Sequence, residues 1–178
     1  MKEKWKLLRF VFAVLCLLPV CANAIIIKDF NTNGQIVDGN EFYTVNVRNN
    51  AMVDMLGGLI TFSINTYNTS VLNISGGTLH GGIVTINMSE SSVLNLSGGL
   101  FYNTWIYPNT STVNIYGRDL TWVIDSEERV HGYWADDTEF LITLARIENA
   151  NIVFYEIPEP VATVFLLIGI LGVRKVRG

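Results

Sequence analysis

Cysteine is almost absent from this 178-residue chain, with Cys16 and Cys21 near the start and none after them. The rest of the chain therefore has neither a disulfide framework nor a thiolate metal site. Charge is also scarce, since Glu90 is the one charged residue between Met55 and Gly117. Hydrolysis of glycosidic bonds needs paired carboxylates, which this stretch does not supply. We predict no catalytic, cofactor-binding or metal-binding residue, and we expect a protein that is not an enzyme and uses no cofactor.

Basic residues are rare between the two ends of the chain. Residues 25–160 contain five basic and fifteen acidic residues, a net charge of −10, whereas the whole chain has a net charge of −4. A body this acidic repels a phosphate backbone. We therefore expect no nucleic acid among the partners of this protein.

The first 24 residues have the pattern of a secretory signal peptide. Four basic residues precede an apolar run over residues 10–20, and Ala22-Asn23-Ala24 supplies the small side chains that signal peptidase requires. We predict cleavage directly after this triplet, before Ile25. Two alternatives stay open. One is an uncleaved anchor helix, although the apolar run is short for spanning a bilayer. The other is a lipoprotein acylated at Cys21, which is disfavoured because a small residue is expected at the position of Val20.

The end of the chain combines a proline motif, an apolar run and a basic terminus. The prolines of Pro158-Glu159-Pro160 end the preceding strand, and residues 161–173 are long enough for an apolar helix of about 20 Å. Arg174, Lys175 and Arg177 can hold the end of this helix on the cytoplasmic side. We predict that the tail anchors the chain in the inner membrane with its body outside.

Taken together, Pro158-Glu159-Pro160, the apolar run and the basic end resemble the PEP-CTERM sorting signal of Gram-negative bacteria, over residues 157–178. In that family an exosortase recognises and removes the signal, and the bacteria usually make extracellular polysaccharide. The resemblance implies an exported protein that is held transiently in the inner membrane and then reaches the cell surface or extracellular matrix. Signal peptidase, exosortase and extracellular polysaccharide would be its partners. A plain tail anchor with a chance Pro-Glu-Pro is the alternative.

The middle of the chain contains a repeat with a period near 20 residues. The segment Ser70–Gly77 recurs as Ser92–Gly99, with weaker copies at residues 51–58 and 111–117. Within each copy, inward and outward positions alternate as in a strand, and the paired glycines permit a sharp turn with positive φ. A fixed period of this length is typical of a solenoid.

We therefore predict an all-β fold, a short right-handed parallel β-helix with a C-terminal β cap. A second alternating run follows the copies, at residues 60–64, 83–87 and 105–107, which gives two or three strands per coil. Asparagines at repeated positions can stack from coil to coil through side-chain hydrogen bonds. An antiparallel sandwich of hairpins is the alternative fold.

The expected organisation has five parts: a signal peptide (1–24), an N-terminal cap with the first strands (25–50), the β-helix repeats (51–118), a C-terminal β cap (119–156) and the sorting signal (157–178). We expect residues 25–43 to close the N-terminal end of the solenoid. In the C-terminal cap, residues 132–138 are similar to a segment that often precedes the sorting signal in β-helical members of the family, which often have glycine at the position of Asp137.

A non-enzymatic structural protein of the surface or matrix, associated with exopolysaccharide, is the function we expect. Two other classes stay open. A small polysaccharide lyase or hydrolase would need two carboxylates brought together beside a groove, from the set Asp125, Glu128, Asp136 and Asp137. A carbohydrate-binding module would stack sugar rings on Tyr102, Trp105 and Trp134. Calcium binding also stays open for two acidic groups: Asp125 with Glu127 and Glu128, and Asp136 with Asp137 and Glu139.

Overall fold

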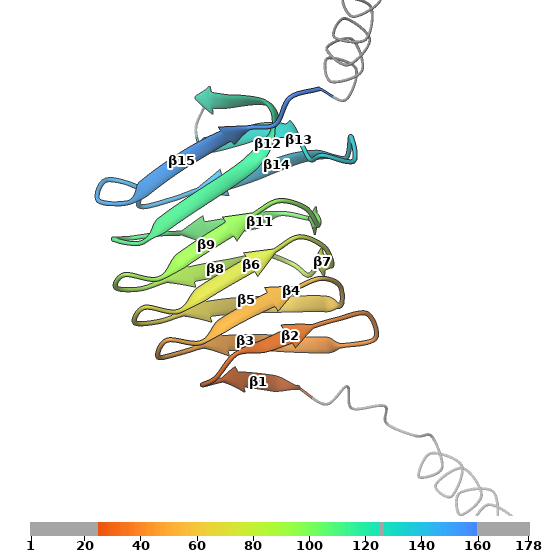
Figure 1. The fold of residues 1–178 in the computed structure, drawn as a ribbon, viewed down its shortest axis with the longest axis vertical. Helices are drawn as coiled ribbons and strands as arrows, with labels where there is room; N and C mark the ends of the chain where they lie inside the picture. The colour runs from red at the N-terminus through yellow and green to blue at the C-terminus, as the bar shows by residue number, and fades with distance from the viewer. Residues whose placement is uncertain (1–24, 125–126, 160–178) are drawn as a thin grey trace, which may run out of the picture.

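The computed structural model describes residues 25–124 and 127–159, which form fifteen strands and no helix (Figure 1). Accordingly, no helix within these residues is long and apolar enough to cross a membrane. Several predicted features lie outside the described residues: the signal peptide with Ala22 and Ala24, the acidic residue Asp125, and the tail with Pro160, Arg174, Lys175 and Arg177.

The chain winds into a β-solenoid of about five turns, whose strands form a front and a rear sheet as seen in Figure 1. The front sheet contains β2 (Gly34–Ile36), β4 (Met52–Met55), β6 (Val71–Ile74), β9 (Val93–Leu96), β12 (Thr112–Ile124) and β15 (Asn151–Glu156). The rear sheet contains β1 (Ile27–Phe30), β3 (Glu41–Val47), β5 (Leu59–Thr66), β8 (Val84–Met88), β11 (Thr104–Tyr107), β14 (Glu139–Leu144) and β13 (Glu128–Tyr133).

Successive coils pair in parallel, which excludes the alternative sandwich of antiparallel hairpins. The front-sheet strands from β2 to β9, the first part of β12 and β15 are all parallel. Two further short strands, β7 (Thr78–Leu79) and β10 (Leu100–Phe101), pair in parallel on a third side of the coil. The predicted period is confirmed, because Val53 pairs with Leu72 nineteen residues later and Leu72 pairs with Leu94 after twenty-two.

The core consists of apolar columns that run along the solenoid, one side chain per coil. One column of the front sheet joins Ile36, Met55, Ile74, Leu96 and Ile115, all at most 1 % exposed. The alternation within each strand directs these side chains inward, as the sequence pattern predicts. Burial of each of these aliphatic side chains contributes about 1.5–3 kcal/mol to the stability of the folded state. Each added coil therefore stabilises its neighbours.

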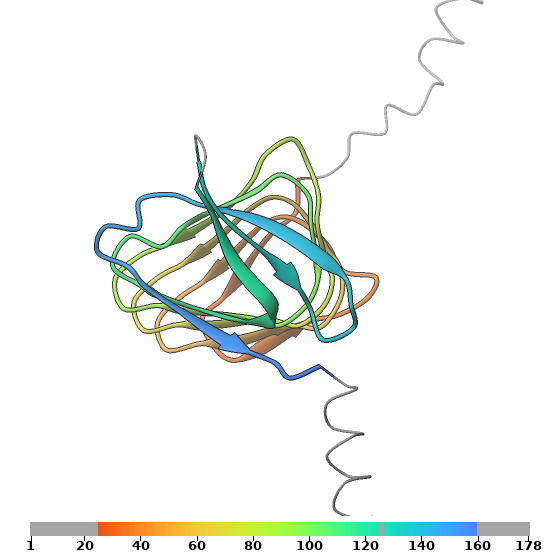
Figure 2. The ribbon, with the colours of Figure 1, turned by 90° about the horizontal axis from the view of Figure 1, so that it is seen from above.

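The two ends of the solenoid differ. At the C-terminal end, the second half of β12 turns back as an antiparallel hairpin with β13, and β13 pairs with β14. Figure 2 looks along the stack and shows this hairpin lying across its end. The strands β14 and β15 then resume the parallel pairing with β11 and β12. The antiparallel hairpin is thus inserted into a further coil.

The N-terminal segment that we expected to close the solenoid forms its first coil instead. Strand β1 pairs with β3, and β2 pairs with β4. Within the described residues, neither strand has a partner on its other edge. Lys28 and Asp29 place charge on β1, which discourages another chain from pairing with this edge.

Candidate interaction surface

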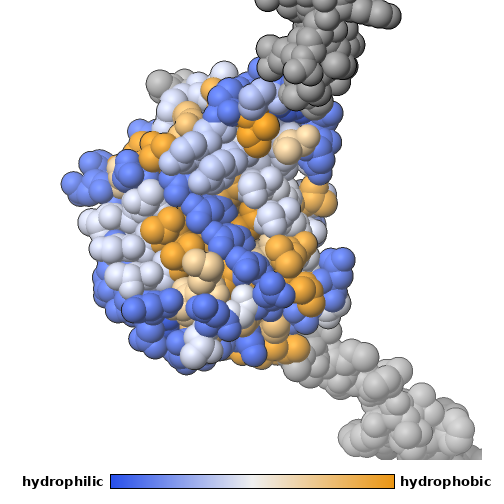
Figure 3. Space-filling view, viewed as in Figure 1, coloured by the Kyte–Doolittle hydropathy of each residue, from blue (hydrophilic) through white to orange (hydrophobic). Residues whose placement is uncertain are grey.

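An amide ladder runs up the outward face of the front sheet. The Nδ2 atoms of Asn73, Asn95 and Asn114 each donate to the Oδ1 atom one coil earlier, at 2.7 Å, and the first acceptor is Asp54. The four residues are in register on neighbouring strands, so the spacing of the coils sets the spacing of the amides. Figure 3 shows a hydrophilic band across this sheet with hydrophobic residues on both sides. The predicted stacking of asparagines from coil to coil is confirmed, although these asparagines lie within strands and the sequence pattern had placed asparagines at the corners.

A second ladder of the same direction lies on the rear sheet. Asn87 donates to Asn65, Asn65 to Asn46, and Asn46 to Asp29, with distances between 2.7 and 2.9 Å. Both ladders therefore begin at a carboxylate at the N-terminal end, where a carboxylate is the stronger acceptor. The shared direction aligns the side-chain dipoles, which strengthen one another.

The corner between the rear and front sheets is held by residues with positive φ. Asn49, Asn68, Glu90 and Asn109 have φ angles of 62°, 59°, 62° and 50° at equivalent places in successive coils. Asparagine tolerates this conformation well, whereas other L-residues rarely adopt it. Glu90 thus occupies an asparagine position, where its carboxylate accepts a hydrogen bond of 2.9 Å from Asn68.

Glycine pairs line the opposite corner, and the two glycines of each pair are needed for different reasons. The second glycine has positive φ, at Gly58 (80°), Gly77 (83°) and Gly99 (104°). The first glycine lacks a positive φ, but a Cβ there would meet the preceding coil: at Gly76 it would strike the carbonyl oxygen of Leu56. The predicted sharp turn is confirmed. However, Gly117, which ends the last copy of the repeat, lies within β12.

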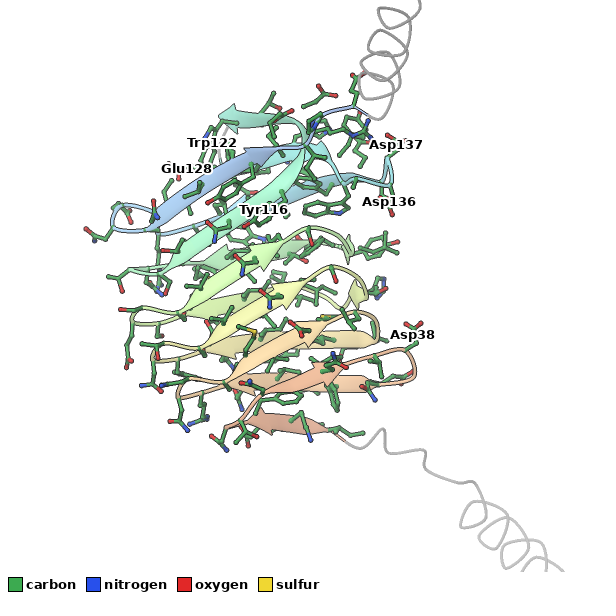
Figure 4. All side chains as sticks on the ribbon, in the orientation of Figure 1. Asp38, Tyr116, Trp122, Glu128, Asp136 and Asp137 are labelled. Atoms are coloured by element: carbon green, nitrogen blue, oxygen red, sulfur yellow. The ribbon has the colours of Figure 1, made fainter. Side chains whose placement is uncertain are left out.

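This glycine corner forms a groove of about 410 Å³. Its floor contains glycines from successive coils, and a Cβ on Gly58, Gly76 or Gly77 would meet the backbone of the preceding coil. Asp38 lies at one end and Asp136 with Thr138 at the other, on the same side of the molecule (Figure 4). None of the residues that line the groove is basic.

Both terminal carboxylates of the groove are held in place by their surroundings. The side chain of Asp38 lies against Gly57, because its Oδ1 atom occupies the space that a Cβ on that glycine would take. At the other end, the backbone amide of Thr138 donates a 3.0 Å hydrogen bond to Oδ1 of Asp136. This hydrogen bond, together with one from the Thr138 side chain, holds the pKa of Asp136 below its ordinary value.

Two of the acidic residues considered for catalysis, Glu128 and Asp136, lie far apart, and a third, Asp125, lies outside the described residues. Glu128 begins β13 and Asp136 follows its other end, so the six-residue strand, about 17–20 Å long, separates them. Figure 4 places the two on opposite sides of the cap. Asp137 pairs with Arg118 rather than with another carboxylate.

The cap also contains a contact between a histidine and a carboxylate. Nε2 of His131 lies 2.8 Å from Oε1 of Glu139. Asp137, which stands where similar segments often have glycine, adopts a φ of 67°. Among the described residues, no three His, Cys, Asp or Glu side chains gather as a metal ion would require.

Each of the three aromatic residues considered for sugar binding packs against a different ring. Tyr102 is half exposed and packs edge-on against His80. Trp105 packs beside Tyr107 on the same strand. Trp134, by contrast, is only 1 % exposed and donates from Nε1 to the carbonyl oxygen of Gly99 at 2.9 Å. Trp134 therefore packs in the core of the cap, where it also lines the glycine groove, and sugar binding by these aromatic residues stays a prediction.

Sequence reasoning missed two features of this surface. Asp38-Gly39 precedes Gly57-Gly58 by nineteen residues and is an earlier copy of the glycine corner, a spacing that was visible in the sequence. Tyr116 and Tyr155 stack at 4.5 Å on the outward face of the front sheet. Their pairing depends on β15 returning beside β12 and had no signal in the sequence.

Compared with known proteins, the chain matches no protein-family model, no curated protein and no solved structure.

Proposed function

We propose that this protein is an exported, non-catalytic structural protein of the cell surface or extracellular matrix, sorted by an exosortase and associated with exopolysaccharide. Residues 1–24 direct its export and residues 157–178 its sorting. Between them lies a solenoid, for which we retain the right-handed sense of the predicted β-helix. Signal peptidase and exosortase act on it during export, and the inner membrane holds it between the two steps.

The observation that carries this proposal is the position of the proline motif. The backbone amide of Ile157 still donates to the carbonyl oxygen of Gly117 at 2.8 Å, so the body extends to the residue before the motif. Pro158 and Glu159 are exposed. A processing enzyme can therefore reach the motif without unfolding the last strand, and the released body would keep β15.

The polar faces of the solenoid support a structural role for the body. Two amide ladders and the parallel strands fix every coil to its neighbours. An array of this kind gives a rigid rod whose surface of amides and hydroxyls can contact hydrated polymer. A carbohydrate-binding module is the second candidate, which the glycine groove favours. A polysaccharide lyase or hydrolase is the third, and the separation of Glu128 from Asp136 disfavours it.

The test compares the native chain with a variant in which Pro158-Glu159-Pro160 is replaced by three alanines. In a host with an exosortase, we expect the native protein to leave the inner membrane and to lose about its last 18 residues, the tail beyond the prolines. The variant should stay in the membrane at nearly full mature length. Intact mass and membrane fractionation measure both. Retention of Arg174 to Gly178 by the native protein would replace the proposal with a plain tail anchor.

A further inference from the structure

The glycine groove has the form of a binding site for an extended chain. It crosses several coils, from Asp38 near the first coil to Asp136 in the cap, and neighbouring coils are about 4.8 Å apart. The groove is therefore on the order of 15 Å long. Its volume of about 410 Å³ falls within the range of ligand sites. A compact ligand would leave much of this length empty, whereas a linear one would fill it.

The chemistry of the groove selects a ligand that donates hydrogen bonds and carries positive charge. Both ends are carboxylates, which accept hydrogen bonds and do not donate them. In the floor, the carbonyl oxygens of Gly77 and Gly99 already accept hydrogen bonds, from the backbone amide of Leu100 and from Nε1 of Trp134, both at 2.9 Å, so the two carboxylates are the acceptors that a ligand would use. The lining lacks a basic side chain that would neutralise the two carboxylates. An acidic polymer would be repelled, and a cationic one attracted.

We propose that this groove binds a single extended chain bearing primary amines, with one ammonium group at Asp38 and another at Asp136. An amine-bearing sugar oligomer and a free linear polyamine share this chemistry. A basic peptide is disfavoured, because peptides gain affinity by pairing with an open sheet edge, and among the described strands beside the groove only the two-residue β10 has an edge without a strand partner. The inference deepens the proposed association with polysaccharide and rests on it for the source of the ligand.

The test is calorimetric titration of the full-length protein in detergent with a fully deacetylated glucosamine tetramer, its N-acetylated form, and spermine. The variant carries Asp38→Asn with Asp136→Asn. The matched control, Glu41→Gln with Glu148→Gln, removes the same charge at exposed positions outside the groove. We expect the variant to bind the glucosamine tetramer at least about tenfold more weakly, since charge-assisted hydrogen bonds are lost. The control should bind like the native protein.

A second variant, Ser75→Trp, fills the groove without a change in charge. Ser75 is an exposed lining residue, so the substitution should leave the thermal unfolding of the solenoid unchanged while it abolishes binding. Equal binding of spermine and the glucosamine tetramer would support the proposed chemistry. It would also show that a free polyamine can supply the amines that the groove binds. Equal binding of the N-acetylated tetramer would overturn the proposal. Tetralysine, titrated as a fourth ligand, would also overturn it by binding more tightly than the glucosamine tetramer, since that would indicate a basic peptide.

Failure of this inference is distinguishable from failure of the proposed function. If the native protein is processed and released but does not bind the glucosamine tetramer or spermine, the inference alone is wrong. If it binds the tetramer but keeps its tail in a host with an exosortase, the sorting proposal alone is wrong.

Discussion

Asn73 donates its Nδ2 hydrogen to Oδ1 of Asp54, nineteen residues earlier, across 2.7 Å. The same bond recurs from Asn95 to Asn73 and from Asn114 to Asn95. Each interior asparagine of the ladder is therefore both a donor and an acceptor, and its loss affects two neighbouring coils. The repeat in the sequence is thus a repeat of hydrogen bonds as well as of apolar core residues.

Replacement of Asn95 by alanine should destabilise the solenoid by about 1–3 kcal/mol. The substitution removes one donor and one acceptor from the partly buried ladder, and it leaves Asn73 and Asn114 each without one partner. Urea unfolding followed by circular dichroism measures the loss. The control is Asn151→Ala, at an exposed position that starts β15. Equal stability of the two variants would show that the ladder adds nothing beyond strand pairing.

Gly77→Ala should cost about 1–3 kcal/mol. This glycine has a φ of 83°, and a Cβ there would lie 2.5 Å from the carbonyl oxygen of Gly57. Gly82→Ala is a matched control, because a Cβ on Gly82 would meet no atom within 4 Å. We expect Gly82→Ala to change stability by less than about 0.5 kcal/mol. Thermal unfolding of both variants decides whether Gly77 is required as described.

Glu90→Asn should stabilise the protein by up to about 1 kcal/mol. Glu90 adopts a φ of 62° at the corner where three other coils have asparagine. A positive φ costs less conformational free energy for asparagine than for glutamate. An asparagine there can also accept the hydrogen bond that Asn68 donates. The control is Glu148→Asn, which removes the same charge from an exposed position without positive φ. A lower unfolding midpoint for Glu90→Asn would mean that the carboxylate itself stabilises this corner.

Asp136→Asn should lower the thermal midpoint slightly at pH 6, and the difference from the native protein should shrink on acidification. Hydrogen bonds from Thr138 hold the pKa of folded Asp136 below its ordinary value of 3.8. The ionised group therefore stabilises the folded state above that pH, and the contribution is lost as the pH falls through the lower folded-state value. Thermal melts between pH 2 and 6 measure the trend, with Glu148→Gln as the control. A difference that grew towards low pH would contradict it.

The sequence alone determined the repeating unit of this protein. Alternation in Val71–Ile74 and its copy Val93–Leu96 places every second side chain in the core, and this property is local to each strand. The period near 20 residues then brings equal residues into register, so the ladder from Asn73 to Asn95 follows from the spacing of the two copies along the chain. The glycine corner was likewise predicted as a turn.

Only the tertiary structure decided what the ends of the solenoid do and which residues line the glycine groove. Trp134 looks like a sugar-stacking residue in the sequence, but the hairpin of β12 and β13 carries it into the core beneath the cap. Asp38 and Asp136 are almost a hundred residues apart in the sequence, yet they lie at the two ends of one groove. Their relation depends on how many coils separate them and on how the cap folds back. These are properties of the whole stack, whereas alternation and turn residues report only on the nearest few neighbours in the chain.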